Sequence, residues 1–444
     1  MEGSRDPDAL LVRALGVREL AATIFNYTVG SGIFALPAIA VAKLGGAAPL
    51  AYFACAIVMA CVVLCFAEAG SRISHTGGPY AYVEVALGPL VGFVAGVLLL
   101  ATGVTAGAGV AVLFAQSLAS LAAPGPSRAV ITTTLIFAAI GGLALLNMRG
   151  VRRGARVIEI VTVAKLLPLV AFIAVGAFFV RPANLAWGAT PHLATVLGTA
   201  GIVIFAFSGI ESALTPSGEV SAPARTVPRA SFLALGAVTV LYLLIQWVAL
   251  GILGGALAGT GATPLAAAAQ VFAGSTGRAV LIVGATVSML GYLSGNMLAV
   301  PRSLFALARD GFLPRPLAAV HPQFRTPHVA VMLYAVMVIG LALSGTFERL
   351  AVLSNLAAFV LYILCAIAVW RLRRLGVRAD GKPFVIPGGP LVPIAACALN
   401  AGLIVETGST HELIGLGALC VAAVLVYWLR ELRRERTSAP RAGR

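Results

Sequence analysis

The stretch TIFNYTVGSGIFALP, Thr23–Pro37, lies in an apolar segment long enough to cross a lipid bilayer. A second such segment contains VIFAFSGIE, Val203–Glu211, and the tripeptide Ser-Gly-Ile interrupts both, at Ser31 and at Ser208. Glycine weakens a helix, and unwound backbone inside a membrane needs new hydrogen-bond partners. Two interrupted segments at corresponding places in two halves of a chain are typical of a transporter's binding site. The pattern therefore predicts a transporter whose substrate lies at the two breaks.

The composition indicates a membrane protein throughout. Of the 444 residues, 60% are hydrophobic and only 11% are charged, and the mean hydropathy is +0.99. A soluble chain of this size would need far more charge to cover its surface. The net charge of +15 does not indicate a nucleic-acid partner, because almost every arginine lies beside an apolar segment.

Twelve apolar stretches recur along the chain, and each is close to the ~20 residues that a membrane-spanning helix needs. The sequence thus predicts an all-α polytopic membrane protein with twelve transmembrane helices. The expected spans are 20–43, 47–71, 89–122, 128–148, 156–180, 193–215, 230–254, 277–308, 326–345, 349–371, 388–407 and 411–430.

The basic residues predict the orientation of these spans. If the N-terminus is cytoplasmic, 25 of the 31 lysines and arginines lie inside, five lie outside, and Lys165 lies within a span. Positive charge collects on the cytoplasmic side of membrane proteins. We therefore expect a multi-pass protein of a prokaryotic inner membrane, with a cytoplasmic N-terminal segment (1–19) and a cytoplasmic tail (431–444).

The positions of the two breaks divide the chain into two halves. Spans one to five (20–180) form a first repeat and spans six to ten (193–371) a second, with one break in the first span of each. Because each repeat has an odd number of spans, the second begins from the opposite face, which makes the repeat inverted. The last two spans (388–430) are additional.

A broken helix offers bare backbone groups to a substrate. Free amides at the start of one half-helix suit a carboxylate, and free carbonyls at the end of the other suit an ammonium group. An α-amino acid has both. Gly30 and Gly32 would let it approach closely, and Ser31 would add a hydroxyl donor. The alternative is that these glycines serve only tight helix packing.

Lys165 lies near the middle of the fifth span, where an uncompensated ammonium is costly. It could gain and lose a proton during a transport cycle, or occupy the place of a sodium ion. Alternatively, it could be bonded permanently to backbone carbonyls and hold the first break open.

Two of the glutamates in or near the spans have predicted roles. Glu211 follows the second break directly, where it is either a gate or pH-sensing group or a cap for freed amides. Glu68 has Arg72 four residues later, which predicts a structural ion pair at the inner end of the second span.

The sequence contains no signature of enzymatic chemistry. The five histidines lie in or near loops and form no ligand cluster, and the six cysteines form no CxxC pair. A phosphate-binding loop, a nucleophile elbow and an HExxH motif are also missing from the sequence. We therefore expect no metal, no cofactor and no enzyme, and transport energised by an ion gradient or by exchange.

Several of these residues together resemble the amino acid–polyamine–organocation (APC) superfamily of permeases, which has the LeuT-like fold. The motifs are spread over the first to the ninth span. They are Gly30-Ser31-Gly32-Ile33-Phe34, Gly77-Gly78-Pro79-Tyr80, Phe205-Ala206-Phe207-Ser208-Gly209-Ile210-Glu211, Glu219-Val220, Pro228-Arg229-Ala230 and Arg309-Asp310-Gly311.

The resemblance implies roles for single residues. The substrate carboxylate would meet the Ser31 hydroxyl and the Gly32 amide, and its amine the carbonyls near Thr28, Phe205 and Ser208. Phe205 matches an aromatic gate position, and Lys165 a fifth-span lysine found in proton-driven symporters and in sodium-independent exchangers. The resulting set of expected substrate-binding residues is Thr28, Gly30, Ser31, Gly32, Phe205, Ser208, Gly209, Ile210 and Asn296.

The sequence thus predicts a secondary transporter of amino acids that works by alternating access, as a proton-coupled symporter or a sodium-independent exchanger. A pocket with no evident acid except Glu211 favours neutral amino acids. The alternatives are an exchanger of cationic amino acids or polyamines that uses Glu211 as counter-charge, and a nutrient sensor of the same fold. The sequence leaves the oligomeric state open.

Overall fold

The computed structural model describes residues 15–73, 77–121, 125–149, 154–214, 220–309, 311–378 and 381–438, with no side-chain detail for 154–164 and 433–438. Glu219 and Asp310 of the family motifs, most of the 1–19 segment and the end of the 431–444 tail lie outside these ranges.

Helices make up the regular structure of the described residues, apart from one isolated parallel bridge between Leu15 and Val220. In chain order the α-helices are α1 (Val17–Thr28), α2 (Gly32–Leu44), α3 (Pro49–Arg72), α4 (Pro79–Leu87), α5 (Pro89–Ala119), α6 (Ser127–Met148), α7 (Gly154–Gly176), α8 (Leu193–Val203), α9 (Ile210–Ala213), α10 (Pro223–Leu253), α11 (Pro264–Arg309), α12 (His328–Ser344), α13 (Phe347–Leu375), α14 (Leu391–Thr407) and α15 (Thr410–Ser438). Short 3-10 turns connect some of them, among them η2 (Gly45–Ala47), η5 (Ile204–Ala206) and η7 (Gly254–Thr260).

A helix or a pair of helices occupies every stretch that the sequence predicts to span the membrane. Within the described residues, eight helices are long and apolar enough to cross a bilayer, or nine if the bent pair of α1 and α2 forms one span. Three further apolar helices are shorter, at Lys165–Phe179, His328–Ser344 and Leu391–Thr407. The chain is therefore a polytopic helical membrane protein, and the count of twelve spans stays a prediction.

Two helices begin well before their predicted spans, because proline is well accommodated in the first turn of a helix, where no intrahelical acceptor is needed. Helix α10 begins at Pro223 instead of 230, so the predicted loop after the sixth span is shorter than expected. Helix α11 begins at Pro264 instead of 277, and Gly274, at φ 59°, separates its first turns from the predicted span.

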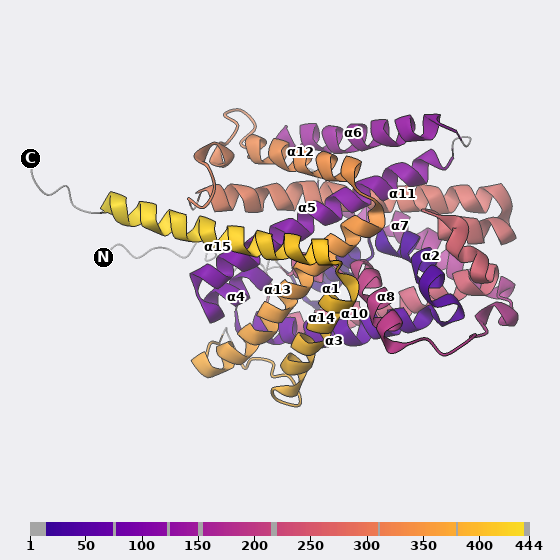
Figure 1. Ribbon diagram of the computed structural model, residues 1–444, viewed down its shortest axis with the longest axis horizontal. Helices are drawn as coiled ribbons and strands as arrows, with labels where there is room; N and C mark the ends of the chain where they lie inside the picture. The colour runs from indigo at the N-terminus through magenta and orange to yellow at the C-terminus, as the bar shows by residue number, and fades with distance from the viewer. Residues whose placement is uncertain are drawn as a thin grey trace, which may run out of the picture.

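The helices near the breaks form the centre of the molecule (Figure 1). Helix α1 packs against α10 and α9, and α2 packs against α8. By contrast, α6 lies along the top of the view, and α15 runs across its front and out beyond the other helices. In their most apolar windows only 17% and 6% of the residues are buried. Apolar helices with such exposed faces are suited to contact with lipid.

Candidate functional site

The first predicted break is present between α1 and α2. Helix α1 ends at Thr28, α2 begins at Gly32, and the two helices are bent by 51° relative to each other. In the short link, the Gly30 amide donates to the Thr28 carbonyl oxygen at 2.8 Å. The first amides of an α-helix have no intrahelical acceptor. The start of α2, at Gly32 and Ile33, therefore presents donors in the interior of the molecule.

The second predicted break is also present. Helix α8 ends at Val203 and is followed by the 3-10 turn η5. The helical conformation is then interrupted at Gly209, which has a φ of 118°. Only glycine adopts that backbone conformation without strain. The chain then resumes as the short helix α9 at Ile210.

The two breaks lie against each other. A Cβ atom added at Gly32 would lie 2.7 Å from Ala206 Cα, and one added at Gly209 would lie 2.7 Å from the Tyr27 carbonyl oxygen. These two glycines therefore provide close packing between the breaks, which is the alternative role that the sequence left open. A Cβ atom at Gly30 would meet nothing closer than 3.6 Å, the distance to a ring atom of Tyr292.

A tyrosine that the sequence analysis did not single out joins the two breaks. The Tyr242 hydroxyl of α10 lies 2.9 Å from both the Thr28 and the Ala206 carbonyl oxygens. Its single hydrogen thus lies between two carbonyl groups. Neither carbonyl has an intrahelical donor, because the helices are interrupted here. Tyr242 is 0% exposed, so water does not compete for these carbonyls. An isolated tyrosine in a long apolar stretch carries no signal that would have identified it.

Lys165 of α7 reaches the first break. Its Nζ donates to the Asn26 carbonyl oxygen at 2.6 Å and to the Val29 carbonyl oxygen at 2.8 Å, and the residue is 3% exposed. These two carbonyl oxygens compensate the ammonium charge. Such hydrogen bonds are expected if the lysine is bonded to backbone carbonyls and holds the first break open. A role of Lys165 in coupling stays a prediction.

Glu211 caps the second break. One carboxylate oxygen accepts from the Gly209 amide at 3.0 Å, and the other accepts from the Tyr362 hydroxyl of α13 at 3.1 Å. The residue is 2% exposed. Of the two roles predicted for it, the capping contact is present; a role as gate or pH-sensing group stays a prediction.

The remaining expected site residues lie at the breaks and are buried or half-buried. Phe205 is 7% exposed, and its ring meets that of Phe347 edge-to-face with 5.5 Å between centroids. The Ser208 hydroxyl donates to the Ile204 carbonyl oxygen at 3.3 Å. Ser31 and Ile210 are both buried, the former as the residue that precedes α2.

Helix α11 carries two polar side chains with long-range hydrogen bonds, one to the first break and one to α5. The Ser288 hydroxyl donates to the Gly30 carbonyl oxygen at 3.2 Å, which ties α11 to the first break. The Asn296 amide donates to the Gly103 carbonyl oxygen of α5 at 2.8 Å. Asn296 therefore joins α11 to α5, and its predicted contact with substrate is untested.

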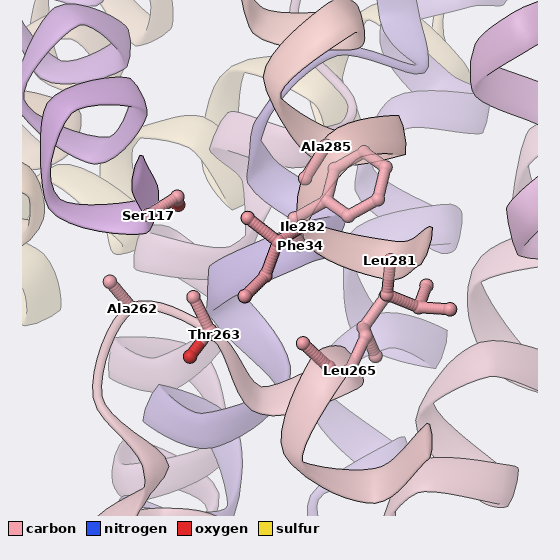
Figure 2. A pocket seen from close by; sticks show the side chains of 9 residues that line it. Phe34, Ser117, Ala262, Thr263, Leu265, Leu281, Ile282 and Ala285 are labelled. Atoms are coloured by element: carbon pink, nitrogen blue, oxygen red, sulfur yellow. The ribbon is translucent and has the colours of Figure 1, made fainter. Parts of the chain in front are cut away.

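A small cavity adjoins the first break. Figure 2 shows Phe34 of α2 close to Ile282 and Ala285 of α11, with Ser117 of α5 on another wall. Its volume is about 10 Å³. That is the lower limit for a single water molecule, so an amino acid could enter here only if the surrounding side chains moved.

Comparison with known proteins agrees with this architecture. The chain is 30% identical over 433 residues to an uncharacterized transporter of Mycobacterium tuberculosis, covering 96% of this chain and 95% of that protein. It is 29% identical to the serine/threonine exchanger SteT of Bacillus subtilis (93% and 96% covered) and 26% identical to the branched-chain amino acid permease BcaP of the same organism (90% and 89% covered). Residues 15–408 match the family model described as amino acid permease. The chain therefore belongs to the amino acid permease family of the APC superfamily, as its motifs predict.

Proposed function

We propose that this protein is a secondary transporter that carries neutral amino acids across the cytoplasmic membrane by alternating access. The observation that carries the proposal is the contact between two broken helices, with Gly32 against Ala206 and Gly209 against Tyr27. Interrupted helices that meet inside a membrane expose backbone dipoles of both signs, which is what recognition of a zwitterion requires.

The backbone groups at the breaks suggest how the substrate binds. Its carboxylate would accept from the first amides of α2 and from the Ser31 hydroxyl, and its ammonium would donate to the carbonyls of Phe205 and Ser208. The Thr28 carbonyl is a weaker candidate in this conformation, because it already accepts from the Gly30 amide and the Tyr242 hydroxyl. A carbonyl oxygen has two lone pairs, so both are engaged.

The surroundings of Glu211 favour a neutral substrate. Both of its carboxylate oxygens already accept a hydrogen bond, from Gly209 and from Tyr362. A cationic side chain would have to displace these donors or share the oxygens with them. The names of two relatives, a serine/threonine exchanger and a branched-chain amino acid permease, point to neutral amino acids as well.

Lys165 would link transport to protons or to exchange. Its ammonium lies on two carbonyls of the first break, where a small cation would otherwise be stabilised. A fixed positive charge there makes a sodium ion unnecessary. Loss of its proton would remove the charge and one of its three N–H donors. Its bonds to both carbonyls would weaken and the break would loosen, which is a route to coupling.

The full architecture that we propose is a LeuT-like fold with twelve spans. It consists of a five-helix repeat over 20–180, an inverted copy over 193–371 and two further helices over 388–430, with both termini in the cytoplasm. The presence of one break in α1–α2 and one in α8–α9 supports this division.

Uptake of radiolabelled amino acids into proteoliposomes tests substrate and mechanism together. We expect uptake of neutral amino acids that does not depend on sodium and that is driven either by an inward proton gradient or by unlabelled substrate inside. Competition by arginine or putrescine, with no competition by neutral amino acids, would instead identify the cationic exchanger. Binding without accumulation under any gradient would identify a sensor.

A further inference from the structure

A second cavity, of about 430 Å³, lies at the end of the molecule where α2 ends and α8 begins. It is open to the surface, and its volume falls within the ~300–1,000 Å³ of small-molecule sites. None of the residues assigned to the substrate at the breaks lines it. The lining residues are Lys43 of α2, Ala194, Thr195, Gly198, Thr199 and Ile202 of α8, and Glu406 and Thr407 of α14.

One side of this cavity is positive. Lys43 contributes an ammonium group near the end of α2. The first turn of α8 lies beside it, and the first backbone hydrogen bond into that helix is donated by Val196. The amides of Ala194 and Thr195 therefore have no intrahelical acceptor, and His192, which precedes the helix, makes no side-chain cap. Free amides at a helix start and a lysine together attract an anion.

The other side of the cavity is negative. Glu406 lies in the last turn of α14, which ends at Thr407. The carbonyl groups of a last turn carry the negative end of the helix dipole, so they add to the carboxylate charge. The Glu406 carbonyl oxygen itself faces α8, since a Cβ atom at Gly198 would lie 3.2 Å from it.

The two charged groups do not neutralise each other. The ion pair of Lys43 is with Glu348, at 3.5 Å, and Glu348 does not line the cavity. Both of these side chains are more than 40% exposed, so the pair is weak and Lys43 can exchange its partner. Thr407 adds a hydroxyl that has no hydrogen-bond partner among the described residues. That hydroxyl lies against Gly201 of α8.

We propose that this cavity binds a zwitterion, with the anionic oxygens of the ligand against Lys43 and the start of α8 and its ammonium group against Glu406. The site is separate from the breaks, so it extends the function proposed above. A free amino acid and the headgroup of phosphatidylethanolamine both have this chemistry. Near this cavity, Trp187, which is 52% exposed, lies close to Gly46 just after α2. Exposed tryptophan is typical of the level of the lipid headgroups.

The test uses the full-length protein in nanodiscs and three variants: Lys43→Gln, Glu406→Gln and, as matched control, Glu348→Gln. The control removes the surface partner of Lys43 and leaves the cavity lining intact. In the lipid arm, native mass spectrometry measures how much phosphatidylethanolamine stays bound, compared with phosphatidylglycerol, which has no ammonium group. In the amino acid arm, thermal unfolding is followed with glycine in discs of phosphatidylglycerol alone.

We expect Lys43→Gln and Glu406→Gln to weaken binding about tenfold in one of the two arms, the loss of roughly one charge-assisted hydrogen bond. That arm identifies the source of the zwitterion, and Glu348→Gln should bind as the wild type does. Glycine bound at the breaks contributes equally in all four proteins, so only the difference between them reports on this cavity. Equal binding by all four proteins in both arms, or an equal loss in Glu348→Gln, would overturn the proposal.

Discussion

At the residue scale, single side chains replace the backbone hydrogen bonds that helix breakage removes. Lys165 and Tyr242 together hold carbonyl groups of the first break, and Glu211 holds an amide of the second. Each of these residues is at most 3% exposed, so bulk water does not compete for these backbone groups. An unpaired buried polar group costs about 1–3 kcal/mol. The geometry of the breaks therefore depends on a few long-range contacts.

Substitution of Lys165 tests its role in transport. We expect Lys165→Ala to lower uptake at least about tenfold, because two carbonyls lose a charge-assisted donor. The remaining uptake should no longer follow pH as in the wild type. Lys382→Ala, which removes an exposed lysine far along the chain, serves as control and should transport normally. Full transport by Lys165→Ala with unchanged pH dependence would refute the coupling proposal. If that variant also had a lower melting temperature, the role of Lys165 would be structural only.

Substitution of Gly209 tests the contact between the breaks. Gly209→Ala adds a Cβ atom 2.7 Å from the Tyr27 carbonyl oxygen at a position with φ 118°. The left-handed backbone alone costs about 1–2 kcal/mol for a residue with a side chain, and the collision adds to it. We expect a lower melting temperature and reduced uptake. Gly236→Ala on α10, where a Cβ atom meets nothing within 4 Å, should leave both unchanged; similar behaviour of the two variants would argue against close contact.

At the element scale, a buried cluster of charged side chains links α3, α13 and the connection that follows α13. Glu68 of α3 pairs with Arg72, as the sequence predicts, and also with Arg373 of α13, whose Nη2 lies 2.6 Å from the carboxylate. The Ile386 amide donates to the same carboxylate at 2.9 Å. The Glu68 side chain is 0% exposed. One carboxylate thus joins two helices to Ile386 of the connection that follows α13.

Removal of the charge on Glu68 should break these ion pairs and destabilise the protein. Glu68→Gln keeps the size of the side chain but leaves two arginines without their anion, and breaking a buried ion pair typically costs about 3–5 kcal/mol. We expect a clear fall in melting temperature, measured in detergent or nanodiscs. Glu431→Gln breaks the partly exposed Arg430–Glu431 pair and should change stability by less than about 1 kcal/mol. Comparable shifts for the two variants would mean that the cluster contributes little.

At the scale of the whole molecule, helix packing separates a buried centre from a lipid-facing periphery. In the most apolar window of α13, 72% of the residues are buried, compared with 6% for α15. The two helices are similarly apolar, so hydropathy alone does not distinguish them. Their placement depends on which helices pack around α1, α8 and α10 (Figure 1).

Cysteine labelling in intact cells tests the orientation of the whole molecule. With the N-terminus inside, Ser127 at the start of α6 faces the exterior and Arg378 after α13 faces the cytoplasm. Both residues are exposed. We expect Ser127→Cys to react with a membrane-impermeant maleimide and Arg378→Cys to react only after the membrane is opened. The wild type, whose six cysteines lie in apolar helices, should react in neither case, and the reverse pattern of labelling would invert the topology.

The sequence alone determined the properties that depend on local chemistry. Apolar runs identified the helices, and Ser-Gly-Ile located both breaks, because glycine is required where the backbone turns to φ 118° at Gly209. Spacing along one helix predicted the pair of Glu68 and Arg72. Membership of the permease family followed from the same short motifs.

Only the tertiary structure decided which distant groups meet. Arg373 lies 305 residues from Glu68, and Tyr242 lies 214 residues from Thr28, so no periodicity could connect them. The same holds for the opposite charges of Lys43 and Glu406, which line one cavity from two helices. Such partners are selected by the way in which helices pack, and helix packing depends on the shape of whole surfaces and not on any single stretch of residues.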